Sequence, residues 1–282
     1  MFNEIQAKQH IDSSEEKSQG FSTIPVCTVP NVSTVPLVDK FLGIQKSTPG
    51  FSRRAVVVEG LNTFEASYPE GSINPKGAIK GGFGCYLERG EFEKAKDVLL
   101  SYAVKFEDGF DFVKGGKLPG LYGGATPELA YGCSGGRQDD RDKCFSLRLM
   151  WRAKGVGEIY TYIPNIPSNH EALKNVPPVT HCNPDFGWSV ARGSFYFNSG
   201  EWTTIAERVR LNDIGCANGR IQLWANGELV VDIHGLEIRV EKEVVFRGAH
   251  FQTFFGGKAQ DWASTKDQCA YFGAISGGVV EW

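Results

Sequence analysis

The sequence lacks several features that define common functional classes. No apolar run approaches the roughly 18 residues of a membrane-spanning helix. None of the seven cysteines forms a Cys-x-x-Cys pair, which argues against a zinc ribbon or a thioredoxin-like site. The segment KGGK at 114–117 lacks the spacing of a phosphate-binding loop, and Leu follows it where Ser or Thr is needed. We therefore expect no membrane partner, no metal and no cofactor.

A strong net charge is also missing. Lys and Arg total 30 against 33 Asp and Glu, so the formal net charge is −3. A general nucleic-acid binder would be basic, and we expect no nucleic-acid partner. The charge is unevenly spread, however, because the window 112–154 holds eight basic and four acidic residues and the remainder is acidic. A basic patch on an acidic chain indicates a specific anionic ligand.

Glycine and aromatic residues are abundant, with 34 Gly, 19 Phe and 12% aromatics among 282 residues. This composition is typical of a β protein with many glycine turns rather than a helical bundle. The Asn226-Gly227 pair is the strongest hairpin signal. The strand candidates are 54–60, 97–106, 144–151, 158–163, 193–197, 219–225 and 244–257. Residues 88–97 form the only fair helix candidate, or else a strand connection. Short strands at this spacing predict an all-β sandwich, jelly roll or barrel.

The chain divides into an arm and one large unit. Residues 1–20 are polar and are expected to form a flexible N-terminal arm. Residues 21–50 contain four prolines, which favours an extended segment over a helix. We see neither a repeat nor a linker between 52 and 282, and we expect 21–282 to be a single domain.

The oxidation state of the cysteines has two interpretations. Cys133 and Cys144 flank the polar segment SGGRQDDRDK, which a disulfide would rigidify. Asn31-Val32-Ser33 is a glycosylation sequon, and both features favour an oxidising, secreted location. A cytosolic protein with seven reduced cysteines is the alternative. No signal peptide is visible in the polar first 20 residues.

Two strand candidates bring polar residues to one face. Strand periodicity places Ser146 and Arg148 on one side of the first, and Tyr160 and Tyr162 on one side of the second. A hairpin with a three-residue loop, 155–157, aligns all four, whereas a two- or four-residue loop separates the tyrosines from the arginine. We predict the three-residue loop. A lone strand tyrosine is usually a packing residue, so the hypothesis depends on the four lying together.

Two other segments carry candidate ligands for an anionic sugar. Lys114 and Lys117 lie in a glycine-rich stretch, although a turn with solvated lysines is the simpler interpretation. Arg247, His250 and Gln252 lie among aromatic residues, a mixture that suits a sugar chain. A histidine in such a strand is more often structural. We take Lys114, Arg247, His250 and Gln252 as candidate substrate-binding residues.

A polyuronate would use such residues. Each sugar carries a carboxylate, and lyases cleave the chain by β-elimination, which removes the C5 proton and expels the oxygen on C4. Cations must stabilise the charge that develops on the carboxylate, and a tyrosine pair can supply base and acid. No Asp/Glu couple of the kind used by β-sandwich glycosidases is evident. A non-catalytic jelly-roll module that binds acidic carbohydrate is the alternative function.

Four separated clusters resemble the catalytic domain of polysaccharide lyase family 14. They are KGGKLPGLYGG, the Ser-x-Arg strand, the Tyr-x-Tyr strand, and FQTFFGG with the DWA and KD that follow it. The likeness spans residues 52–275. It implies a jelly-roll β-sandwich of antiparallel sheets with a concave, basic substrate cleft. It also implies lyase activity on alginate or β-1,4-glucuronan, with unsaturated uronate ends as products.

The resemblance also implies the site. The essential lysine falls on Lys117, the Ser and Arg on Ser146 and Arg148, and the two tyrosines on Tyr160 and Tyr162. It supports a disulfide between the cysteines that flank SGGRQDDRDK. We favour Tyr160 or Tyr162 as base and acid, with Arg148 and Lys117 neutralising the carboxylate and Ser146 orienting it. Lys117 as the base is the alternative and needs a depressed pKa. We expect a secreted monomer whose partner is an anionic polysaccharide.

Overall fold

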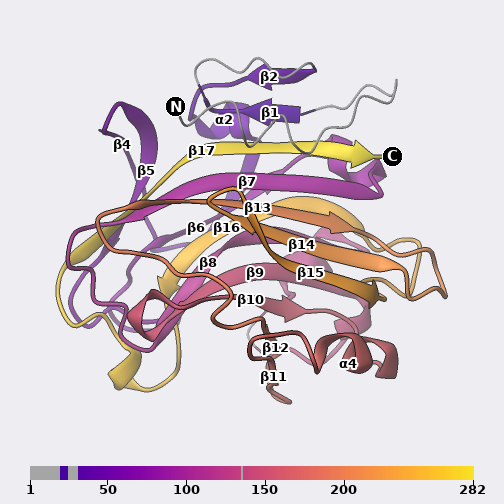
Figure 1. Cartoon of the computed structure of the whole chain (residues 1–282). Coiled ribbons are helices and arrows are strands. Elements are labelled where there is room, and N and C mark those ends of the chain that lie inside the picture. Colours follow the sequence, from indigo (N-terminus) through magenta and orange to yellow (C-terminus); the bar gives the residue numbers. More distant parts are fainter. Residues whose placement is uncertain (1–19, 25–30, 135) are drawn as a thin grey trace.

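The structure is a computed structural model that describes residues 20–24, 31–134 and 136–282. The expected flexible arm, 1–20, lies outside the described residues apart from Gly20, which begins a strand. Two large sheets, antiparallel in nearly every pairing, form stacked layers, with β17, β7 and β13 in the upper layer and β8, β9 and β10 in the lower (Figure 1). The all-β sandwich is therefore confirmed.

The described residues of the upper sheet form nine strands. Their order is β15 (Glu228–Leu236), β14 (Gly219–Ala225), β13 (Trp202–Arg210), β7 (Asp97–Phe106), β17 (Gln268–Glu281), β1 (Gly20–Ser22) and β2 (Val32–Thr34), and the hairpin of β4 (Arg54–Val58) and β5 (Leu61–Tyr68) joins through β17. Only β1 and β2 pair in parallel among these described strands. Since β1 pairs with β17, the first and last described strands share one sheet.

The lower sheet has eight strands in the described ranges. Their order is β11 (His181–Cys182), β12 (Trp188–Val190), β10 (Gly157–Tyr162), β9 (Cys144–Arg152), β8 (Gly115–Gly124), β16 (Val245–Phe255), β6 (Phe83–Glu88) and β3 (Ile44–Ser47). The helices are short: α2 (Asp39–Leu42), α3 (Pro127–Tyr131) and α4 (Pro167–Leu173), with 3-10 turns η1 (Gly90–Lys94), η2 (Arg141–Lys143), η3 (Ala153–Gly155) and η4 (Gln260–Trp262). The longest of these described helices has seven residues, so none has the length of a membrane span.

Most of the predicted strands are present, and one is wrong. Residues 97–106 and 219–225 are strands with the predicted bounds, and Asn226 and Gly227 turn with φ of 50° and 85°. The segment 88–97 is a strand connection rather than an α-helix, because it joins the end of β6 at Glu88 to the start of β7 at Asp97 through the 3-10 turn η1. Residues 193–197 are a loop, with one isolated bridge to the β9–β10 connection. The alternation of Phe195 and Phe197 that predicted a strand arises because both rings are buried against the core.

Aromatic side chains fill the space between the sheets. Trp151 on β9 is fully buried, and its indole nitrogen donates a hydrogen bond to the carbonyl of Phe112 at 3.1 Å. Its ring makes edge contacts with Phe106 on β7 and Phe255 on β16, with ring centroids 5.4 Å apart in each pair. Such edge-to-face pairs add to the free energy from burial of apolar surface. The other face of the lower sheet is thus left for polar residues.

The β9–β10 hairpin has the predicted face but not the predicted loop. Trp151 pairs with Gly157, so residues 152–156 form a five-residue connection. Lys154 and Gly155 adopt φ of 61° and 73°, which the tight η3 turn requires. Five, like three, is odd, so the side-chain alternation is preserved. The prediction that the serine, the arginine and both tyrosines share a face is confirmed.

A β-bulge in β8 is tied to the opposite sheet. Lys117 pairs with Met150 and Gly120 with Arg148, which leaves one extra residue on β8. The buried carboxyl group of Glu207 on β13 accepts a hydrogen bond at 2.8 Å from the backbone N–H of residue 121, directly after the bulge. The hydroxyl of Tyr102 on β7 donates to the carbonyl of residue 119 at 3.2 Å. The upper sheet therefore holds the strand that carries Lys117.

Glu207 should make stability depend on pH. Burial raises the pKa of its carboxyl to about 8, against about 4.3 in an unfolded chain. The contribution of Glu207 to the free energy of unfolding is therefore fully present below the pKa of the unfolded chain. It is lost as the pH rises through the pKa of the folded protein. Relative to Glu207→Gln, the wild-type free energy of unfolding should fall between about pH 5 and pH 8, by up to about 1.4 kcal/mol per unit. Urea denaturation at several pH values measures this free energy. Identical pH profiles for the wild type and Glu207→Gln would contradict the prediction. Glu228→Gln, at an exposed position, is the control.

Candidate active site

A row of register neighbours crosses the lower sheet and forms the floor of the site. Tyr160 pairs with Arg148, Arg148 with Gly120, Gly120 with His250, and His250 with Tyr86. Directly opposed residues project from the same face of a sheet. Gly120 contributes no side chain, and a Cβ there would collide with the backbone of β9. The row thus has a gap between the arginine and the histidine.

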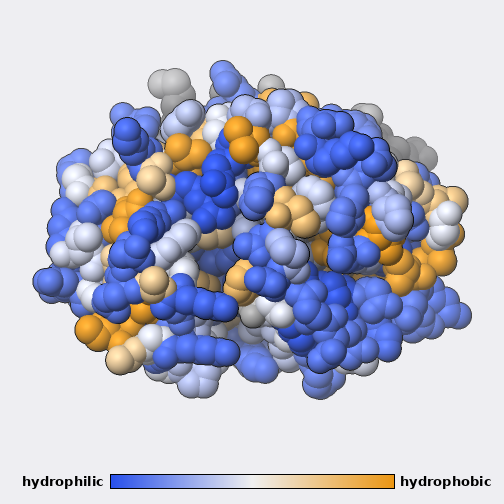
Figure 2. Space-filling view, turned by 90° about the horizontal axis from the view of Figure 1, so that it is seen from below, coloured by the Kyte–Doolittle hydropathy of each residue, from blue (hydrophilic) through white to orange (hydrophobic). Residues whose placement is uncertain are grey.

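Adjacent rows add further polar residues. Lys117 pairs with Met150 on one side of the row, and Ser146 pairs with Tyr162 on the other. Figure 2 shows the molecule from below the lower sheet, where a hollow is rimmed mainly by hydrophilic residues. The predicted serine, arginine, lysine and tyrosines are therefore brought together by β8, β9 and β10.

Lys117 is a buried cation surrounded by rings. Its Nζ lies 3.5 Å from the ring centroid of Tyr160, 5.7 Å from that of Tyr162, and 3.0 Å from the Sδ of Met150. The residue is 8% exposed and forms no ion pair with any described carboxylate. Burial, together with repulsion from Arg148, holds the pKa of the Lys117 amine well below its usual range. Loss of a proton from this amine is therefore easier than from an exposed lysine.

Arg148 is a second buried cation without a carboxylate partner among the described residues. Its Nη1 donates to the Oε1 of Gln252 on β16 at 2.7 Å, while its Nε has no hydrogen-bond partner in the described part of the chain. Burial lowers the pKa of the guanidinium, which nevertheless stays charged because an arginine titrates so high. Gln252 thus orients the arginine and leaves its charge uncompensated.

The nearby buried carboxylate of Glu158 is already engaged. It accepts from Arg152 at 2.6 Å, from Arg192 at 2.7 Å and from the hydroxyl of Ser189 at 2.6 Å. These donors hold the pKa of Glu158 below its usual value, against the effect of burial, which acts in the opposite direction. Two arginines share one carboxylate, so this side of the site remains electropositive.

The two tyrosines lie edge to face, with ring centroids 5.5 Å apart. Burial raises the pKa of Tyr160 above the ordinary phenol value, so the hydroxyl keeps its proton at neutral pH. Ser146 is 1% exposed, and its Oγ has no hydrogen-bond partner among the described residues. Its hydroxyl thus has hydrogen-bonding capacity that no described residue uses.

His250 is buried and stacks on Tyr86, with ring centroids 4.2 Å apart. Burial and repulsion from Arg148 and Lys117 hold the pKa of the imidazole well below its usual value, so the ring is neutral. Its Nε2 has no hydrogen-bond partner within the described residues. The histidine and Gln252 therefore belong to the same face as the arginine.

The other two candidate binding residues are not brought into this group. Lys114 is half-exposed and forms an ion pair with Asp261. Arg247 donates to Glu93 at 2.8 Å and to two backbone carbonyls at 124–125. Both cations are therefore already paired with groups of the protein.

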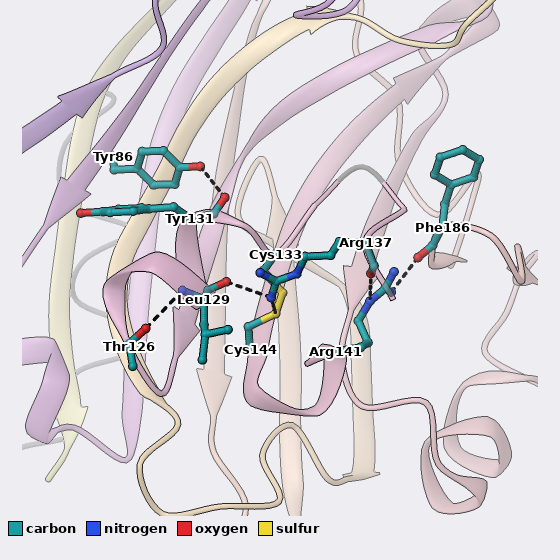
Figure 3. Close-up of a disulfide and its surroundings, with 9 residues drawn as sticks. All are labelled: Tyr86, Thr126, Leu129, Tyr131, Cys133, Arg137, Arg141, Cys144 and Phe186. Atoms are coloured by element: carbon teal, nitrogen blue, oxygen red, sulfur yellow. Dashed lines mark hydrogen bonds between the residues drawn. A yellow bond between two sulfur atoms is a disulfide. The ribbon is translucent and has the colours of Figure 1, made fainter. Parts of the chain in front are cut away.

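The Cys133–Cys144 disulfide is present, with Cα atoms 5.9 Å apart (Figure 3). It packs in one cluster with Met150, Tyr160 and Tyr162. The other described cysteines are free thiols, at positions 85, 182, 216 and 269, and Cys27 lies outside the described residues. The bridge therefore borders the site.

Sequence reasoning missed several neighbours of the site. Met150 and Arg152 continue the alternation of Ser146 and Arg148, and Glu158 precedes Tyr160 by two. Strand periodicity alone would have placed all three on the polar face. Tyr86 could not be found this way, because only the pairing of β6 with β16 brings it beside the histidine.

The fold and the site define a β-sandwich with a buried cationic patch on one sheet. The family model of polysaccharide lyase 14 matches residues 58–275, and the chain belongs to this family. It is therefore a polysaccharide lyase, and the jelly-roll expectation is confirmed. None of the curated proteins matches the chain.

Several solved structures are similar. The marine alginate lyase of Aplysia kurodai is 30% identical with a TM-score of 0.74, and the match covers 93% of this chain and 98% of that one. An alginate lyase of Chlorella virus is 21% identical with a TM-score of 0.65, over 82% and 90% of the two chains. The endo-β-1,4-glucuronan lyase of the fungus Trichoderma reesei shares the fold, at 11% identity and a TM-score of 0.52, over 84% and 91%.

Removal of the Glu158 carboxylate should destabilise the fold. Glu158→Gln leaves two arginines without their shared partner, and we expect the free energy of unfolding to fall by about 3 kcal/mol. The control Ser189→Ala removes one hydrogen bond to this carboxylate and an acceptor of Arg192, but it leaves both arginine–carboxylate ion pairs intact, so it should cost only about 1–2 kcal/mol. Chemical denaturation at neutral pH compares the two. Equal losses would mean that the arginines do not depend on the carboxylate.

Proposed function

We propose that the chain cleaves polyuronates, either alginate or β-1,4-glucuronan, by β-elimination. The observation that carries the proposal is the pair of buried basic side chains, Lys117 and Arg148, neither of which has a described carboxylate partner. An unpaired buried charge is costly, so an anionic ligand is the natural complement. The similar lyases of alginate and glucuronan support a uronate as that ligand.

In this proposal Arg148 binds the carboxylate of the sugar that loses its C5 proton. That proton is only weakly acidic until the carboxylate charge is neutralised, because removal of the proton places further negative charge on the same group. A preorganised guanidinium stabilises the developing charge without any reorganisation of solvent. Ser146, whose hydroxyl has no described partner, orients the same carboxylate.

We assign the base to Lys117, where the residues alone favoured a tyrosine. Its lowered pKa makes the amine easier to deprotonate than an ordinary lysine, which favours it as a base. The amine takes the C5 proton, the electrons of that bond form the C4–C5 double bond, and the C4–O bond breaks. The departing oxygen takes the phenol proton of Tyr160, whose raised pKa keeps the hydroxyl protonated. The ammonium and the phenolate then lie side by side, and the proton returns.

The first test is product formation by the wild type. Incubated with polymannuronate, polyguluronate and glucuronan, it should generate unsaturated uronate ends, which ultraviolet absorbance detects, from at least one polymer. The alternative function, a module that only binds acidic carbohydrate, predicts measurable binding with no absorbance increase on any of the three. New reducing ends without unsaturation would indicate hydrolysis instead.

A charge-preserving variant separates the base from a simple cation. Lys117→Arg keeps a positive charge but cannot become neutral, so kcat should fall by about 10²–10⁴, as in Lys117→Ala. If the lysine only neutralises charge, Lys117→Arg should retain most of the activity. The pH profile of wild-type kcat/KM adds a second readout: activity should rise with pH through a pKa below that of an ordinary lysine, because the base works only when unprotonated. An activity that falls across that range would contradict the assignment.

We also propose that the protein works outside the cell. The Cys133–Cys144 bridge needs an oxidising compartment to persist. Asn31, in the sequon, is exposed. An extracellular location also gives the protein access to a polymeric substrate.

A further inference from the structure

The disulfide closes a loop that is fastened to a second loop. Within residues 133–144, Gln138 donates from its Nε2 to the backbone carbonyl of Asp185 at 2.9 Å. Arg141 donates from its Nη1 to the carbonyl of Phe186 at 2.7 Å, as Figure 3 shows. The loop is therefore held at three points, which are the disulfide and these two contacts with the turn between β11 and β12.

Arg141 lies over one of the site tyrosines. Its guanidinium carbon is 4.9 Å from the ring centroid of Tyr162. Its Nε donates to the carbonyl of Arg137 at 2.9 Å, which fixes the plane of the guanidinium. The side chain is half-buried, and its pKa is lowered by burial but raised by attraction to Tyr162. The loop thus presents a rigid cation at the tyrosine side of the site.

The charge of Arg141 is not neutralised by the acidic residues of its own loop. Asp140 pairs with Lys143 at 3.0 Å. Within the described ranges Arg141 forms no ion pair, and its Nη2 has no hydrogen-bond partner. Arg152, which lies 5.9 Å from the ring of Tyr160, is by contrast paired with a carboxylate. Arg141 therefore resembles Arg148 in being a positioned cation without a protein anion.

We propose that Arg141 is a further substrate-binding residue, which receives the carboxylate of the sugar adjacent to the one that is cleaved. Tyr162 lies two residues along β10 from Tyr160, which is roughly 6.6 Å in a strand and comparable to one pyranose unit. Arg148 pairs with Tyr160 and Arg141 lies over Tyr162, so the two cations lie at neighbouring positions of this strand, as the carboxylates of adjacent sugars would require. The planar fork of a guanidinium suits a carboxylate better than an ammonium does. This inference rests on the proposed function.

Steady-state kinetics on a cleaved polyuronate test the inference. Arg141→Gln should raise KM roughly tenfold, the effect of losing one charged hydrogen bond, and leave kcat within about a factor of two, because the lost contact binds substrate and transition state alike. Arg141→Lys, which keeps the charge but loses the fork, should give an intermediate KM. Lys143→Gln removes the same charge from the same loop and should change neither parameter.

An unchanged KM in Arg141→Gln would overturn the inference. So would an equal increase in Lys143→Gln, which would mean bulk electrostatics, or a fall in kcat alone, which would mean an effect on the tyrosines. Thermal unfolding shows whether Arg141→Gln is folded. If it is not, the KM of Arg141→Lys decides whether Arg141 binds substrate. If the wild type cleaves no polyuronate, the proposed function fails separately, and equilibrium binding of uronate oligosaccharides by the same variants decides whether Arg141 binds the carboxylate.

Discussion

The site depends on two cations that are buried on one face of a sheet without a carboxylate to compensate them. Lys117 and Arg148 are buried beside tyrosine rings, and neither forms an ion pair with a described carboxylate. Such an arrangement is unfavourable for folding alone, and it lowers the pKa of the lysine. The same electrostatic cost favours the binding of an anionic sugar beside Arg148 and makes the amine of Lys117 easier to deprotonate. Affinity and basicity thus have one physical origin.

The rest of the fold keeps these cations in place. The lower sheet packs its inner face, with Trp151, against the aromatic core, so its outer face can be polar without loss of packing. The bulge in β8 turns Lys117 outward, and Glu207 and Tyr102 hold that bulge from the opposite sheet. Glu158 forms ion pairs with two further arginines, which would otherwise add to the repulsion between the buried cations.

Strand periodicity was sufficient to predict which residues of β9 and β10 share a face, because face depends only on whether the loop is odd. It could not predict the loop length, which depends on the positive φ of Lys154 and Gly155. The glycine-rich segment around Lys117 resembled a solvated turn, yet it is a buried central strand, because glycines permit close packing against Trp151. His250 was placed correctly among aromatics, but its proximity to Arg148 arises from long-range pairing.

The most direct test of the account is the response to loss of the substrate charge. Methyl esterification of the uronate carboxylates leaves the sugar backbone intact and removes the anion that the buried cations are proposed to bind. The account predicts that the wild type binds the esterified polymer far more weakly than the free polyuronate. Equal affinities for the two polymers would contradict it, because the cations would then have no role in recognition.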